Sequence, residues 1–331
     1  MRKVVLEAFG GPQVLRLADA PEPVAPPGGC VVELAAIGVN FAELVERRGL
    51  YRKDQRLPYE IGKEAAGRVV AVHPDADGIR VGDRVIVIRF EGGCYAERVA
   101  ALPHQLLPIP AHLDLEEAAA FAIAFATAWY AQEELARVRT GEAVLIQAAA
   151  GATGGAAIQL ARARGCDPVI GVVGRAAKRE AVLGLGAHLC AAESEGPSFE
   201  EVVREHCGSK GGVDYCLESV GGAVFDRSLS ALAPLGRLVA IGFSSVEKDH
   251  ANTIKRVHPL QLFLRSWGLM GLNVENIDFP RRRATFERLA AFAAQHGLRP
   301  AIGGRFPLCD AAGAHAAIEA RNTTGKVLLI P

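Results

Sequence analysis

A glycine-rich turn carries the strongest chemical signal in the sequence. The apolar run Val144–Gln147 predicts a buried strand that leads through this turn into a helix over Gly154–Arg164. Counted from Ala149, the turn has the spacing G-x-G-x-x-G, with alanine first, Gly151 second and Gly154 third. Gly151 would let a pyrophosphate approach the backbone, and Gly154 would let the helix pack closely on the strand. A tight turn without a ligand is the alternative, but the position between strand and helix favours a bound dinucleotide.

The next predicted strand indicates which dinucleotide would bind. Val169–Val173 runs into Gly174 and Arg175, with Lys178 one turn later and no acidic residue before Glu180. An acid at this distance from the turn would bind the ribose hydroxyl of NAD, whereas a 2′-phosphate needs cations. The sequence therefore favours NADPH, with two exposed cations at a helix start as the alternative and NADH as a minor option. The predicted cofactor contacts here are Ala150, Gly151, Ala152, Thr153, Gly154, Gly174, Arg175 and Lys178.

Alternation of strands and helices after Pro110 predicts the fold class. Parallel strands joined by helices need right-handed crossovers, so we expect the doubly wound parallel sheet of an α/β protein. The further strands are predicted over Val213–Leu217 and Arg237–Phe243. The further helices are predicted over Leu115–Val138, Lys178–Leu185, Phe199–His206 and Phe225–Leu232.

The first hundred residues are predicted to be β-rich, and the tail is mixed. Turn signals separate the predicted strands Val4–Phe9, Val31–Val39, Gly67–His73, Arg84–Ile88 and Tyr95–Ala100. In the tail we expect strands over Leu269–Val274 and Lys326–Ile330, and helices over Arg281–His296 and Ala311–Ala320.

Composition excludes several classes of protein. Of 331 residues, 50% are hydrophobic, so the chain can bury a large core without disulfide or metal staples. Lys and Arg total 37, as do Asp and Glu, which argues against nucleic acid as the main partner. The apolar run Ala118–Ala131 is too short to span a bilayer, and the N-terminus does not have the pattern of a signal peptide. Seven widely spaced cysteines argue against a disulfide framework and favour the cytoplasm.

Several further segments resemble the medium-chain dehydrogenase/reductase superfamily, specifically its zinc-independent quinone oxidoreductase (zeta-crystallin-like) branch. The resemblance covers nearly the whole chain. Its segments are 37–41, 48–51, 62–67, 81–85, 148–154, 213–214, 219–222, 235–239 and 325–329. Within the branch, Asn40–Leu44 and the ending Gly325–Pro331 resemble vesicle amine transport protein-like members.

The resemblance implies a GroES-like catalytic domain at residues 1–122, completed by the tail 271–331, beside a Rossmann domain at 123–270. It implies an active cleft between the domains and a homodimer joined by the Rossmann sheets. Later strand ends should face the nicotinamide half of the cofactor. The residues predicted there are Val220, Gly242, Phe243, Ser244, Leu272 and Asn273.

The resemblance also bears on the catalytic residues. Zinc-dependent relatives carry Cys within the segment that reads Ile37–Asn40 here and His where Lys63 stands, so no metal is expected. Asn40 and Tyr51 match polar cleft residues of the family and are predicted to donate hydrogen bonds to the substrate or to position it, with Tyr51 or solvent as the source of the proton. The alternatives are an Asn40 that ties down the loop after residue 39, a Tyr51 that only packs, and a Lys63 that either lines the cleft or projects outward.

Two departures from the family pattern concern the cofactor. Thr153 stands where the family often has valine, and Ala192–Glu193 replaces an Asn-Tyr pair whose tyrosine helps to hold the 2′-phosphate. The second departure weakens the case for NADPH.

Together these features predict an NADPH-dependent, zinc-independent reductase. Its acceptor would be a quinone or an α,β-unsaturated carbonyl compound, including enoyl groups, to which hydride is transferred in a dry, oriented site. The alternative is a dinucleotide-binding association or sensor protein with little catalysis. The expected partners are a small-molecule substrate and a second copy of the chain.

Overall fold

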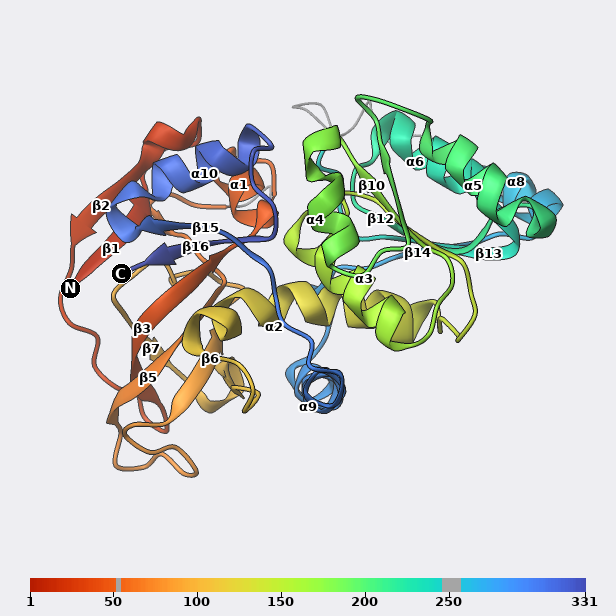
Figure 1. Cartoon of the computed structure of the whole chain (residues 1–331). Coiled ribbons are helices and arrows are strands. Elements are labelled where there is room, and N and C mark those ends of the chain that lie inside the picture. Colours follow the sequence, from red (N-terminus) through yellow and green to blue (C-terminus); the bar gives the residue numbers. More distant parts are fainter. Residues whose placement is uncertain (52–54, 246–256) are drawn as a thin grey trace. The chain divides into compact units, whose positions relative to one another are not determined.

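The computed structural model describes residues 1–51, 55–245 and 257–331. Contacts divide the chain into two compact units (Figure 1). The strand-rich unit contains Met1–Ile123 and Ile277–Pro331, and the parallel-sheet unit contains Ala124–Asn276. The tail therefore completes the N-terminal unit, and residues 271–276 belong with the parallel sheet.

The parallel-sheet unit contains one sheet of six strands in the order β11-β10-β9-β12-β13-β14, all parallel. The order reverses at β9, which confirms the predicted doubly wound α/β fold. Its strands are β9 (Val144–Ile146), β10 (Val169–Val173), β11 (Leu189–Ala192), β12 (Val213–Glu218), β13 (Leu232–Ala240) and β14 (Gly268–Gly271). Its helices are α3 (Ala152–Ala163), α4 (Arg179–Gly184), α5 (Phe199–Cys207), α6 (Gly222–Ser230) and α8 (Pro259–Arg265).

The central strands form because their residues are apolar on both faces. Every residue of β9 and β10 is buried, as expected for parallel strands covered by helices on both sides. Helix α5 begins at a capping box in which the Ser198 hydroxyl accepts the Glu201 N–H and the Glu201 carboxylate accepts the Ser198 N–H.

Several elements differ from the predictions made from sequence. Strand β11 and helix α8 were not predicted, and β11 has the residues Leu-Cys-Ala-Ala, which give only a weak strand signal. The predicted strand 269–274 ends at Gly271. The predicted helix 115–138 consists of α2 (Leu115–Trp129) followed by a π-helical turn (Tyr130–Leu135).

The strand-rich unit contains a seven-stranded sheet, whose main path is β15-β16-β3-β5-β6-β8 with β7 also pairing to β3, and a three-stranded sheet, β2-β1-β4. Its strands are β1 (Arg2–Leu6), β2 (Leu15–Asp19), β3 (Cys30–Val39), β4 (Tyr59–Glu60), β5 (Glu64–Val72), β6 (Arg84–Ile88), β7 (Arg98–Ala101), β8 (Leu106–Pro108), β15 (Ile302–Pro307) and β16 (Lys326–Ile330). Its other helices are α1 (Phe41–Arg47), α9 (Phe279–His296) and α10 (Ala311–Glu319).

Strand β3 is the strand on which the polar residues of this unit converge. It pairs with β5 on one side and with β16, the last strand of the chain, on the other. Gly38 of β3 is the register partner of both Glu64 and Leu328, so residues from the beginning and end of the chain meet there. Helix α1, which was not predicted, follows β3 directly.

All seven cysteines are free, and five of them are buried. Among the described residues, no helix combines the length and apolar character needed to cross a bilayer.

Candidate active site

The residues predicted to contact the cofactor lie along one edge of the parallel sheet. Because all six strands run in the same direction, their carboxyl ends meet at this edge, and ligands of such sheets bind where the strand order reverses. We call it the carboxyl edge. The predicted residues follow five strands: 150–154 after β9, 174–178 after β10, Val220 after β12, 242–244 after β13 and 272–273 after β14.

The glycine-rich turn wraps tightly around its own backbone. Ala148 has a positive φ of 49°, and Gly151 is the N-cap of α3. A Cβ at position 154 would lie 2.5 Å from the Ala148 carbonyl oxygen and 2.8 Å from the Ala149 Cα, so only glycine fits. The first N–H groups of a helix have no partner within the helix, and those of α3 therefore point out at the carboxyl edge.

Basic residues follow the end of β10. Gly174 and Arg175 are exposed and Lys178 is half-buried. A Cβ at Gly174 would have no atom within 4 Å, so the backbone here is open to a ligand. The Ala176 N–H donates to the Ser194 hydroxyl over 3.1 Å, which joins this segment to the one that follows β11.

The ends of β12 and β13 are joined by backbone hydrogen bonds. The Ser244 N–H donates to the Ser219 carbonyl over 3.0 Å, and the Ser245 N–H donates to the Val220 carbonyl over 2.8 Å. The Glu218 carboxylate accepts the N–H groups of Val220 at 2.7 Å and Gly221 at 2.9 Å. Burial raises the pKa of Glu218. Glu218, which was not predicted from the sequence, shapes the loop that contains the predicted residue Val220.

The end of β14 is also tied to the sheet. The Leu272 N–H donates to the Ala240 carbonyl over 2.9 Å, and the Asn273 side-chain carbonyl accepts the Glu275 N–H over 3.0 Å. The Asn273 side chain therefore stabilises the turn that follows it. Phe243 is exposed, while Gly242, Ser244 and Leu272 are half-buried.

Asn40 lies in the strand-rich unit, at the N-cap of α1. Its Oδ1 accepts a hydrogen bond from the Lys326 ammonium over 2.6 Å, and its Nδ2 donates to the Glu43 carboxylate over 3.2 Å. The Asn40 N–H also donates to Glu43, over 2.7 Å. These bonds hold the loop after Val39, which is the role given above as the alternative to substrate binding by Asn40. The second Nδ2 hydrogen has no partner among the described residues and can serve as a donor.

Tyr51 is half-buried and stacks on a buried cation. The Lys63 ammonium lies 4.1 Å from the centroid of the Tyr51 ring and 2.9 Å from a Glu46 carboxylate oxygen. Such a contact contributes about 0.5–2 kcal/mol. The Lys63 side chain is only 2% exposed, so it points into the unit rather than into solvent.

A second buried ion pair crosses over Gly38. The Lys326 ammonium binds the Glu64 carboxylate, whose other oxygen accepts the Ile123 N–H over 2.9 Å. A Cβ at Gly38 would lie 2.8 Å from Lys326 Cε and 2.9 Å from Glu64 Cγ. Gly38 therefore leaves the space that this pair fills.

Glu43 links the two ion pairs. It is fully buried, and its Oε1 accepts the Lys63 N–H over 3.1 Å as well as the Asn40 amide. Burial and the nearby Glu46 carboxylate raise the pKa of Glu43 to about 7. The association of Glu43, Glu46, Glu64 and Lys326 was not predicted from the sequence, because these residues come from three separate segments. We call Asn40, Glu43, Glu46, Lys63, Glu64 and Lys326 the buried charged cluster.

The buried charged cluster does not fit zinc. The Lys326 ammonium already binds Asn40 and Glu64, and the Lys63 ammonium already binds Glu46. Zinc sites are built from nitrogen, thiolate and carboxylate donors in tetrahedral arrangement. Across residues 1–51, 55–245 and 257–331, no three His, Cys, Asp or Glu side chains are grouped as metal ligands.

Two family models match the chain. The model described as "Alcohol dehydrogenase GroES-like domain" matches residues 26–111, and the one described as "Zinc-binding dehydrogenase" matches residues 152–295. Each model falls largely within one of the two units.

Individual proteins are similar over the full length. Human quinone oxidoreductase is 32% identical over 337 residues, covering 100% of this chain and 98% of its own length. The crystal structure of Escherichia coli quinone oxidoreductase complexed with NADPH has a TM-score of 0.90 at 29% identity, with both chains fully covered. An NAD-dependent alcohol dehydrogenase has a TM-score of 0.88 at 30% identity, also with full coverage. The chain belongs to the medium-chain dehydrogenase/reductase superfamily of oxidoreductases, in its quinone oxidoreductase branch.

Proposed function

We propose that this chain is an NADPH-dependent reductase that transfers hydride to a quinone or an α,β-unsaturated carbonyl compound without a metal. The observation that carries the proposal is the carboxyl edge, where a turn that requires glycine at position 154 leads into α3 and where Arg175 and Lys178 follow the neighbouring strand. Similarity to a quinone oxidoreductase solved with NADPH supports the same choice of cofactor.

Each segment of the carboxyl edge has a part in this proposal. The N-terminus of α3 and residues 150–154 hold the pyrophosphate, since a helix N-terminus attracts anions. Arg175 and Lys178 bind the 2′-phosphate, for which arginine offers a bidentate contact. Val220, the loop 242–244 and the segment 272–273 hold the nicotinamide half. NADPH, when bound, supplies the hydride.

Asn40 and Tyr51 are proposed to bind the acceptor oxygen, on which negative charge develops. Asn40 offers its second Nδ2 hydrogen, and Lys326 and Glu43 fix the orientation of its amide. Tyr51 offers its hydroxyl, with its ring held by Lys63. A single donor aimed at such an oxygen contributes on the order of 10²- to 10³-fold in rate.

A turnover assay tests the proposed activity. NADPH oxidation is followed at 340 nm with a panel of quinones, enones and enoyl thioesters as acceptors. We expect turnover with at least one of these classes. NADPH binding without turnover over the whole panel would instead select the association or sensor role, to which a structural neighbour described as a VAT-1 homolog-like vesicle membrane protein gives some weight.

Arg175→Ala tests the choice of cofactor. Loss of a cation that contacts the 2′-phosphate should lower NADPH affinity about tenfold and leave NADH affinity unchanged. Fluorescence titration of wild type and variant with both nucleotides measures this. Equal NADPH affinity in the two proteins would refute the role of Arg175.

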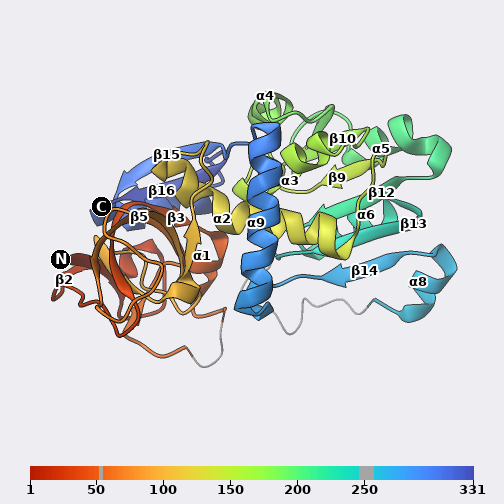
Figure 2. The ribbon, with the colours of Figure 1, turned by 90° about the horizontal axis from the view of Figure 1, so that it is seen from below.

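We also propose a homodimer and a cytoplasmic location. Strand β14 is at the end of the sheet order, next to helix α8 (Figure 2). On α8 the side chains of Leu260, Phe263 and Leu264 are 54%, 77% and 69% exposed. A sheet edge next to exposed apolar side chains suits pairing with a second copy. Light scattering after size exclusion should show a dimer for wild type and a monomer for Phe263→Glu.

The proposed cytoplasmic location is supported by the free cysteines, which fit a reducing compartment.

A further inference from the structure

Glu193 stands beside the proposed 2′-phosphate site. It follows β11 directly, and its N–H donates to the Val173 carbonyl over 2.9 Å. Val173 and Ala192 are register partners, so the next residues, Gly174 and Glu193, leave adjacent strands at the same level of the carboxyl edge. Adjacent strands lie about 4.8 Å apart. The Glu193 carboxylate therefore follows the strand next to the one that leads into Arg175 and Lys178, the residues proposed to bind the 2′-phosphate.

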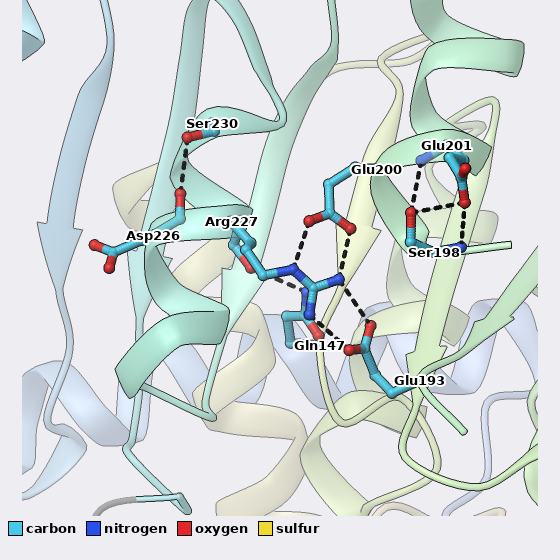
Figure 3. A network of polar contacts seen from close by, with 9 residues as sticks. Gln147, Glu193, Ser198, Glu200, Glu201, Asp226, Arg227 and Ser230 are labelled. Atoms are coloured by element: carbon cyan, nitrogen blue, oxygen red, sulfur yellow. Dashed lines mark hydrogen bonds and ion pairs between the residues drawn. The ribbon is translucent and has the colours of Figure 1, made fainter. Parts of the chain in front are cut away.

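Arg227 of α6 binds this carboxylate with one side of its guanidinium (Figure 3). Its Nη1 donates to Glu193 Oε2 over 2.6 Å, and its Nη2 donates to Glu193 Oε1 over 3.3 Å. The other side donates to Glu200 of α5, with Nε at 2.5 Å and Nη2 at 2.6 Å from the two carboxylate oxygens. The guanidinium carbon lies 4.5 Å from the centroid of the Phe199 ring. Arg227 is therefore held on three sides.

The positive charge on Arg227 reduces the repulsion between the Glu193 carboxylate and a nearby anion. These bonds lower the pKa of Glu200 and raise that of Arg227, so this ion pair stays charged at neutral pH. An unpaired carboxylate at the end of β11 would repel the 2′-phosphate of NADPH, which carries close to two negative charges. NADH lacks that phosphate, and the same carboxylate would repel it far less.

We propose that Arg227 is a specificity-determining residue, which allows NADPH to bind by pairing with Glu193 and so reducing the repulsion between that carboxylate and the 2′-phosphate. It acts through Glu193 and is a positioning residue rather than a direct ligand. The proposal rests on the proposed function, because it presupposes that NADPH binds at the carboxyl edge. It also explains how a chain with an acid in place of the family's tyrosine after β11 can use NADPH.

The test is a set of four variants titrated with NADPH and NADH. Arg227→Gln should lower the ratio of NADPH to NADH affinity about three- to tenfold, as expected for a solvent-screened carboxylate next to a phosphate. Glu193→Gln in that background should restore the ratio to within about twofold of wild type. Glu193→Gln alone should leave the ratio unchanged or raise it.

Arg237→Gln is the matched control. Arg237 pairs with Glu142 over 3.1 Å in the same unit, where β13 aligns with the start of β9 and β12, away from the carboxyl ends. Arg237→Gln removes the same charge as Arg227→Gln but at a distance from the carboxyl edge. The ratio of NADPH to NADH affinity should therefore stay at the wild-type value. The ratio also cancels any loss of folded protein common to both titrations.

The outcomes separate the two proposals. If wild type binds neither nucleotide, the proposed function fails. If wild type prefers NADPH but Arg227→Gln keeps its ratio, or lowers both affinities equally, Arg227 only joins α5 to α6 and the inference is overturned. An Arg227→Gln loss that Glu193→Gln does not reverse would equally overturn it.

Discussion

The carboxyl edge and the buried charged cluster are built in opposite ways. At the carboxyl edge the proposed binding groups are mostly backbone: the glycine turn, the start of α3 and the loops after β12 and β13. In the strand-rich unit the polar groups are side chains. There, Lys326 pairs with Glu64 and Lys63 pairs with Glu46, both in the interior. A backbone site depends on local conformation, whereas a side-chain cluster depends on pairing between distant segments.

The largest expected effect comes from breaking the cluster at its long-range contact. Lys326→Met leaves the Glu64 carboxylate buried without its cation, which should lower the free energy of unfolding by about 3–5 kcal/mol. NADPH affinity of the folded protein should not change. Urea denaturation and nucleotide titration measure the two quantities.

Lys3→Met is the matched control for that variant. Lys3 pairs with Glu60 in the same unit, but the Glu60 side chain is 53% exposed, so its loss should cost less than about 1 kcal/mol. If both methionine variants lose the same free energy of unfolding, the buried ion pair contributes no more than the exposed one. The proposed dependence of the cluster on its buried pairs would then be wrong.

At the glycine turn we expect a smaller loss of stability, together with a loss of NADPH affinity. Gly154→Ala places a methyl group 2.5 Å from the Ala148 carbonyl oxygen, and should cost about 1–3 kcal/mol of unfolding free energy. Displacement of α3 should also lower NADPH affinity at least tenfold. In Gly184→Ala the added methyl meets no atom within 4 Å, so stability should hold or rise by up to about 1 kcal/mol. Unchanged NADPH binding in Gly154→Ala would contradict the role of the turn.

The last prediction concerns the pH dependence of the strand-rich unit. His315 of α10 is buried against the Tyr95 hydroxyl at 3.0 Å, and burial, then Arg47, lowers its pKa to about 3. Between pH 6.5 and 3, His315 therefore binds more protons in the unfolded chain than in the folded one, and the stability that this residue contributes falls as the pH falls.

His315→Gln removes this dependence. Between pH 6 and 4, wild type should lose about 1.4 kcal/mol per pH unit more than the variant in urea denaturation. His296→Gln, at an exposed position near the end of α9, is the control and should follow wild type. Parallel curves for wild type and His315→Gln would show that His315 does not titrate as its burial implies.

The same contrast explains what the sequence could predict. Gly154 and Arg175 lie within one strand-helix-strand unit, so spacing alone predicted the turn and the strand end. Lys326 is separated from Asn40 by most of the chain, and only the pairing of β16 with β3 brings them together. Glu193 was noted only as a departure from the family pattern. Its partner Arg227 lies on α6, and no local pattern connects the two.

Direct titration with NADPH and NADH tests the central claim, that the carboxyl edge binds a phosphorylated dinucleotide. Fluorescence of the reduced nicotinamide should show saturable NADPH binding, with NADH at least tenfold weaker, and Gly154→Ala should weaken the binding of both nucleotides, because both carry the pyrophosphate. Absence of saturable binding of either nucleotide to the folded wild-type protein would contradict the account.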